Sequence, residues 1–156
     1  MKSPWMPPPP LAFDTRVRLW ISERLIETGR APSVDDISRG LGTGATEIRA
    51  SLRRLHDGHV LVLHEISGEL LMVAPFSCVP TPFEVEAGKG SWWGNCIWDA
   101  LGILAMLKQD GRVVTSCGCC GDPLTVTVRD GMLAAAAGVV HFALPAKDWW
   151  KDIVLT

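Results

Sequence analysis

Residues 92–101 read WWGNCIWDAL, and the helix that this stretch predicts is the element around which the second half of the chain is organised. Asn95 is a favoured helix N-cap residue, and apolar residues follow it at helical spacing until Gly111 ends the pattern. The apolar positions are Leu101, Leu104 and Leu107. The pattern therefore predicts a helix that places Cys96 in its first turn.

Cys96 and Asp99 form the candidate chemical pair of this helix. At a helix start, unpaired backbone N–H groups and the helix dipole favour an anion, so we expect the Cys96 thiol to ionise more easily than a free cysteine. Asp99 follows three residues later and therefore lies on the same face, so a thiolate and a carboxyl group can reach one small substrate together. The alternative is structural: a small buried cysteine, and an aspartate that only complements the helix dipole.

The rest of residues 77–156 predicts a small sheet beside this helix. Residues 83–87 alternate apolar and acidic side chains, as a half-buried strand does, and residues 112–116 and 124–130 predict strands on either side of a cysteine-rich turn. Residues 132–137 fit either a helix or a strand. Residues 139–144 predict a strand that carries His141 as a core histidine, and residues 146–153 predict a short helix.

The first half predicts a winged-helix-like domain over residues 13–76, after a proline-rich arm at residues 1–12. A first helix over residues 14–28 begins with Asp14 as its cap and ends at Gly29. A second starts with a capping box of Ser33 and Asp36, and a third covers residues 46–56. Two strands, over residues 59–64 and 69–73, then predict a hairpin. Prolines 75, 80 and 82 mark a linker, and the whole chain is expected to be α+β.

DNA binding by this first unit is an alternative that its charge does not favour. Arg49, Arg53 and Arg54 lie on the third helix, which enters the major groove in helix-turn-helix proteins. Acidic and basic residues balance over the first half, however, and phosphate contacts dominate DNA affinity. We therefore do not expect DNA as the partner, and we interpret His56, His59 and His64 as surface or wing residues.

Composition and cysteine content indicate a cytoplasmic globular chain. The 156 residues are 47% hydrophobic, and the formal net charge is -2. Neither a signal-peptide pattern nor an apolar stretch long enough to span a membrane is present, so no membrane partner is expected. Five cysteines, three of them at Cys117, Cys119 and Cys120, suggest thiol or metal chemistry rather than a disulfide framework, and Cys78 is interpreted as incidental.

Several motifs together resemble the organomercurial (alkylmercury) lyases over most of residues 14–156. They are Cys96 with Asp99 at i+3, a helix-turn-helix-like N-terminal region, the cysteine-rich turn followed by Gly-Asp-Pro-Leu at 121–124, and VHFALP at 140–145 leading to WWKDI at 149–153. The resemblance implies protonolysis of carbon–mercury bonds to a hydrocarbon and Hg(II), with Cys96 as the attacking thiolate that holds the metal and Asp99 as the proton relay. The resemblance implies that no cofactor is needed, since mercury is the substrate. It also implies that Hg(II) is handed on to a mercuric reductase.

The sequence departs from this family in one respect. The family uses a second cysteine further along the chain, and this sequence ends at Thr156 without one. We therefore expect a truncated chain, a substitute among Cys117, Cys119 and Cys120 acting as metal ligands, or a protein that has left mercury chemistry. The alternatives are a single-thiol homologue that binds or transforms another small organic or thiophilic ligand, and a soft-metal-responsive winged-helix regulator. A structural turn with inert thiols is the competing interpretation of the three cysteines.

Core filling is the default interpretation of Trp92, Trp93, Trp98, Trp149 and Trp150, and a wall for a hydrophobic organic group is the alternative, which stays open for all of them but Trp93. Trp93 is expected to form an apolar wall that binds the organic group of a substrate. Such a wall excludes water and raises the pKa of Asp99 by desolvation, which keeps the carboxyl group available as an acid.

Overall fold

The computed structural model describes residues 12–134, 138–142 and 144–154. All but the last residue of the expected proline-rich arm lies outside these ranges, as do residues 135–137 of the ambiguous segment. Helices combine with one antiparallel sheet, which confirms the α+β class. Among the described residues, none of the helices has the length and apolarity needed to span a bilayer.

Three helices open the described chain, as predicted: α1 (Phe13–Thr28), α2 (Val34–Leu41) and α3 (Ala45–Asp57). α1 ends at Gly29, whose left-handed backbone (φ 67°) lets its N–H donate to the Leu25 carbonyl. The predicted capping box of Ser33 and Asp36 starts α2. The prediction for Asp14 was wrong, because Ala12 occupies the N-cap position.

Asp14 instead joins α1 to α3. Its carboxylate accepts hydrogen bonds from Ser51 Oγ (2.7 Å) and from the Arg54 guanidinium (2.6 and 2.9 Å). Arg54, one of the three arginines considered for DNA contact, is therefore already paired within the protein. The interpretation of this unit as a winged helix stays a prediction.

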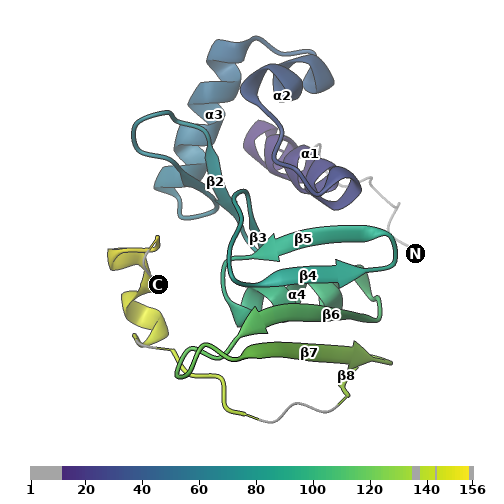
Figure 1. Cartoon of the computed structure of the whole chain (residues 1–156). Helices are drawn as coiled ribbons and strands as arrows, with labels where there is room; N and C mark the ends of the chain where they lie inside the picture. The colour runs from purple at the N-terminus through teal and green to yellow at the C-terminus, as the bar shows by residue number, and fades with distance from the viewer. Residues whose placement is uncertain (1–11, 135–137, 143, 155–156) are drawn as a thin grey trace, which may run out of the picture.

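Within the described residues, an eight-stranded sheet follows the helices (Figure 1). Its order is β1-β2-β3-β5-β4-β6-β7-β8, and every neighbouring pair is antiparallel. The strands are β1 (Val62–Leu63), β2 (Leu70–Val73), β3 (Phe76–Ser77), β4 (Glu84–Ala87), β5 (Gly90–Gly94), β6 (Gly111–Ser116), β7 (Pro123–Arg129) and β8 (Met132–Leu133). The predicted hairpin is β1–β2, although β1 covers only residues 62 and 63 of the strand predicted over 59–64. The strands at 83–87, 112–116 and 124–130 are confirmed with small shifts at their ends.

The strands β3 and β5 were not predicted, and the strand predicted over residues 139–144 is absent from the described part of that range. β3 lies inside the expected linker, and it pairs with both β2 and β5, so the sheet continues across the expected domain boundary at residues 76 and 77. The prediction of a strand over 139–144 was wrong for its described residues, which have no strand structure. Val139 there is 93% exposed, because no neighbouring strand pairs with this apolar run.

The helix α4 (Ile97–Leu107) covers one face of the sheet. Its buried residues Ala100, Ile103 and Leu104 join the core formed by Val85 and Val113. The helix ends at Leu107 with Lys108 in the left-handed conformation (φ 52°), not at Gly111 as predicted. Gly111 begins β6 instead, where a Cβ atom would meet the Glu86 carbonyl oxygen at 2.4 Å.

The end of the described chain folds back toward the start of α4 and the β1–β2 hairpin (Figure 1). The short helix predicted over residues 146–153 is a 3₁₀ helix, η1 (Ala146–Lys151). The three helices are tied to the sheet by Trp92, whose indole Nε1 donates to the Leu25 carbonyl at 2.8 Å.

Candidate functional site

Cys96 occupies the N-cap position of α4. The prediction that Asn95 is the cap was wrong, because β5 runs to Gly94 and the chain stays extended through Cys96 (φ -146°) before the helix begins. The Asn95 side chain turns to Asp99 instead, and its Nδ2 donates to Asp99 Oδ2 at 3.0 Å. A Cβ atom on Gly94 would lie 2.5 Å from the Ala100 backbone nitrogen, so this strand-to-helix junction depends on glycine.

The Cys96 and Asp99 side chains lie side by side at this junction. The thiol is within hydrogen-bonding reach of the carboxylate, and both residues are half-buried. The predicted proximity is therefore present, because Cys96 is the N-cap and Asp99 the third residue of the helix, two positions that meet across the first turn.

The predicted direction of the thiol pKa was wrong. Burial raises the pKa of the Cys96 thiol, and the neighbouring Asp99 carboxylate raises it further. The backbone N–H groups of Asp99 and Trp98 act in the opposite direction but do not outweigh these effects. Burial also raises the pKa of Asp99, against hydrogen bonds from Asn95 and Cys96 that lower it. At rest the pair is therefore a neutral thiol beside a desolvated carboxyl group.

A cavity of about 230 Å³ opens directly onto this pair. Its polar lining consists of His59, Asn95, Cys96 and Asp99, and its remaining side chains are apolar. The aromatic part of the wall consists of Trp98, Phe142, Trp149 and Trp150. The cavity is thus a mostly apolar chamber with one thiol and one carboxyl group in its wall, which suits a small apolar organic group bound to a thiophilic atom.

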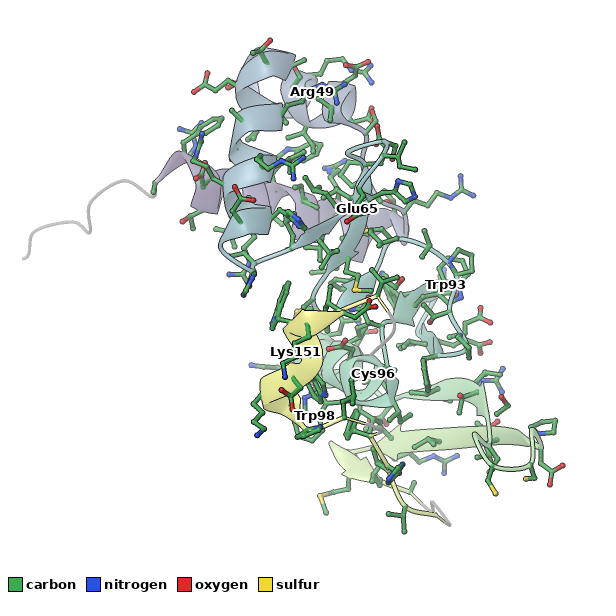
Figure 2. All side chains as sticks on the ribbon, turned by 90° about the vertical axis from the view of Figure 1, so that its left-hand side faces the viewer. Arg49, Glu65, Trp93, Cys96, Trp98 and Lys151 are labelled. Carbon is green, nitrogen blue, oxygen red and sulfur yellow. The ribbon has the colours of Figure 1, made fainter. Side chains whose placement is uncertain are left out.

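The last described segment forms one wall of the cavity. Trp150 stacks on the His59 ring with centroids 4.2 Å apart and planes 9° apart. Trp149 Nε1 donates to the Leu144 carbonyl at 3.0 Å, which fixes the segment internally. Figure 2 shows this segment, labelled at Lys151, beside Cys96 and Trp98. Residues 59–62, the hairpin residues Met72 and Ala74, and the chain end therefore complete a site whose reactive pair lies on α4.

Trp93 does not line the cavity, so the expectation that it walls the site was wrong. Side chains alternate along a strand, and Trp92 faces the core beside Val85 under α4. Trp93 therefore lies on the opposite face, and in Figure 2 it is well apart from Cys96 and Trp98. Trp98, Trp149 and Trp150 supply the apolar wall instead.

The other cysteines and His141 lie outside this cavity. Cys117, Cys119 and Cys120 form the turn between β6 and β7. In the described part of the chain no three His, Cys, Asp or Glu side chains are arranged to hold a metal ion, which gives a three-cysteine site no support. Cys78 is half-buried, and burial raises the pKa of its thiol to about 12. His141 is exposed, not a core histidine, because the strand expected around it does not form.

Sequence reasoning missed His59 and Asn95. His59 was interpreted as a surface or wing residue; it is exposed, and its stack on Trp150 also makes it part of the cavity wall. Ninety-one positions separate the two rings in the sequence, and no local pattern joins them. Asn95 was treated as a cap, but it lies one residue before the N-cap of α4, and its side chain reaches Asp99 from there.

The sequence model of a family described as "Alkylmercury lyase" matches residues 76–156, just over half of the chain. A solved structure titled "Crystal structure of the mercury-bound form of MerB2" has a TM-score of 0.64 and 20% sequence identity. The match covers 78% of this chain and 58% of that one, so this chain spans less than two thirds of that protein's length. No curated protein matches the sequence.

Proposed function

Since the chain belongs to the alkylmercury lyase family, we propose that it cleaves the carbon–mercury bond of organomercurials to give a hydrocarbon and Hg(II). The observation that carries the proposal is the contact between Cys96 and Asp99 at the wall of an apolar cavity. Breaking this bond needs a soft donor for the metal and an acid for the departing carbon. Thiolate sulfur is the matching ligand for a soft metal, and an adjacent carboxyl group can move the proton.

In the first step the thiol exchanges its proton for mercury. An organomercurial enters as R–Hg–X, where X is an exchangeable anion such as a halide or a small thiolate. The Cys96 sulfur forms a bond to mercury, X leaves as an anion, and the thiol proton passes to the Asp99 carboxylate. The raised pKa of Cys96 keeps the thiol protonated, so the thiol needs a base to become a nucleophile, and the Asp99 carboxylate is that base.

In the second step the stored proton breaks the carbon–mercury bond. Asp99, now a carboxylic acid, protonates the carbon, and the electron pair of the C–Hg bond becomes the new C–H bond. Hydrocarbon R–H leaves, the carboxylate is restored, and mercury stays on the Cys96 sulfur as a cation. Burial raises the pKa of Asp99, which favours holding the proton until carbon takes it.

The surrounding side chains have supporting roles. The amide of Asn95 donates to Asp99 Oδ2 and orients the carboxylate toward the thiol. The aromatic wall of Trp98, Trp149 and Trp150 holds the organic group and limits water near the reacting carbon. Mercury on Cys96 then has an open coordination position, which an external thiol fills when it removes the metal. That thiol belongs to a small molecule or to a partner such as a mercuric reductase.

The proposal is tested by measuring hydrocarbon release. Phenylmercury acetate is incubated with the full chain, and benzene and inorganic mercury are quantified. Wild type should release both, whereas Cys96→Ser and Asp99→Ala should release neither above the uncatalysed rate. Cys119→Ser is the matched control, because this thiol is exposed and outside the cavity, and it should keep full activity.

A second candidate is a binder that uses the same thiol without cleaving the substrate. It is favoured by one observation: among the described residues that line the cavity, Cys96 is the only cysteine. A wild-type chain that binds the organomercurial one-to-one at Cys96 and releases no benzene would overturn the lyase proposal and support this one.

A further inference from the structure

The turn between β6 and β7 is a second, separate thiol site. The chain closes on itself through two backbone hydrogen bonds, from Cys117 N to the Asp122 carbonyl and from Gly121 N to the Cys117 carbonyl, each 2.8 Å. Gly121 has φ 76°, a conformation that glycine adopts readily and that allows the return of the chain. The closure brings the first and last cysteines of the Cys-Gly-Cys-Cys sequence together.

Cys117 and Cys120 interact with each other and with Asp122. Cys120 Sγ donates to Asp122 Oδ2 at 3.2 Å and is also within hydrogen-bonding reach of the Cys117 sulfur. The backbone N–H groups of Cys120 and Cys119 lower the pKa of Cys117, and the Cys120 thiol lowers it further. The third cysteine differs, because Cys119 acts on Cys117 through its backbone while its side chain is exposed.

The pKa values of the two thiols are shifted in opposite directions, downward for Cys117 and upward for Cys120. The backbone N–H of Asp122 lowers the pKa of Cys120, but the Asp122 carboxylate and the Cys117 sulfur outweigh it, and the net direction is upward. The turn therefore presents a sulfur whose pKa is lowered beside one whose proton points to the Asp122 carboxylate, which can accept that proton when a metal displaces it.

We propose that Cys117 and Cys120 together bind a soft, thiophilic metal ion such as Hg(II) in two-coordinate fashion, independently of the Cys96 cavity. Each sulfur forms one bond to the metal, and two protons leave: the Cys120 proton by way of the Asp122 carboxylate, and the other directly to water. A linear two-coordinate ion needs no third ligand, which agrees with the lack of a three-ligand cluster among the described residues.

The pairing gives the site its strength. Once the metal is on one sulfur, the second is held beside it by a closed turn, so the second bond forms within one molecule and at high effective concentration. A single cysteine, exposed or buried, lacks this advantage. Cys120 is exposed and Cys117 half-buried, so the pair is reachable from solvent without entry into the Cys96 cavity.

The test uses the full chain with Cys96→Ser, which removes the proposed lyase nucleophile and separates the two questions. Mercuric chloride is titrated against a monothiol competitor, N-acetylcysteine. Binding is followed by sulfur-to-mercury charge-transfer absorption, and stoichiometry by native mass spectrometry. One Hg(II) per chain should be retained. Adding Cys117→Ser or Cys120→Ser should weaken retention by about 100-fold, because the chelate is lost.

Cys119→Ser in the same background is the matched control and should retain the metal as before. Far-ultraviolet circular dichroism checks that all variants are folded. Equal retention by all three added variants would overturn the proposal, because the metal would then sit elsewhere. Loss of retention in the Cys119 variant would also overturn it, because the pair would be wrongly assigned.

Discussion

Replacing Asp99 by asparagine should change two properties of the site in opposite directions. The side chains are nearly equal in size, so the cavity stays intact while the charge and the transferable proton disappear. The Asp99 carboxylate raises the pKa of Cys96 through its charge and its hydrogen bond, so in Asp99→Asn that pKa should fall, although burial still holds it up. Cys96 should therefore react faster with an alkylating reagent at a fixed pH near neutrality.

Carbon–mercury cleavage should fall in the same variant. A positioned acid–base group contributes about 10²- to 10⁴-fold to rate. At about 1.36 kcal/mol per tenfold, this corresponds to roughly 2.7–5.4 kcal/mol of transition-state stabilisation. The upper part of this range applies if Asp99 acts in both steps, as its contact with the thiol suggests. The thiol should still take up mercury, so the variant should accumulate the Cys96–Hg–R adduct.

Two measurements check this prediction. The pH dependence of iodoacetamide labelling at Cys96, read by mass spectrometry of its peptide, gives the thiol pKa, and benzene release from phenylmercury acetate gives the cleavage rate. Asp122→Asn is a matched control, since it removes a carboxylate beside a different thiol. The reasoning is refuted if Asp99→Asn retains more than a tenth of wild-type release, or if its Cys96 labelling midpoint moves to higher pH.

Three further predictions concern the structure around the site. Gly94→Ala should lower the urea midpoint, with over-packing against the α4 backbone costing about 1–3 kcal/mol, whereas Gly118→Ala, whose added Cβ meets nothing within 4 Å, should not. Asp14→Asn should flatten the acid-induced loss of stability. Hydrogen bonds from Arg54 and Ser51 lower the pKa of Asp14 in the folded protein. The Asp14 carboxylate therefore stabilises the fold above its unfolded pKa, and this stabilisation is lost as the pH falls through the folded pKa. An unchanged acid-unfolding profile in Asp14→Asn would contradict this. Trp150→Ala should remove the stack on His59, worth about 0.5–1.5 kcal/mol, and speed hydrogen exchange over residues 144–154. Unchanged exchange there would show that other contacts hold the segment.

Local patterns in the sequence determined much of the secondary structure. The end of α1 at Gly29, in the left-handed conformation, was predictable from the glycine, and the capping box at Ser33 was predictable from Asp36 three residues later. The alternation around Val85 predicted β4 and the face it buries. These signals act over a few residues, because caps and strand alternation depend on near neighbours in the chain.

The proximity of Cys96 and Asp99 was also determined locally. With Cys96 as the N-cap, Asp99 is the third residue of the helix, and these two positions meet across the first turn as in a capping box, so the pair survives the shift of the N-cap from Asn95 to Cys96. The wall of Trp98, Trp149 and Trp150, by contrast, depends on segments far apart in the sequence.

Tertiary structure alone decided the environment of that pair. The helix start by itself predicted an acidic thiol, yet burial by the hairpin and by the segment that carries Trp150 raises the pKa of Cys96. The same applies to Trp93, whose face of the sheet follows from its pairing with β4 and β3. Desolvation depends on which distant segments cover a side chain, and no spacing within a short stretch contains that information.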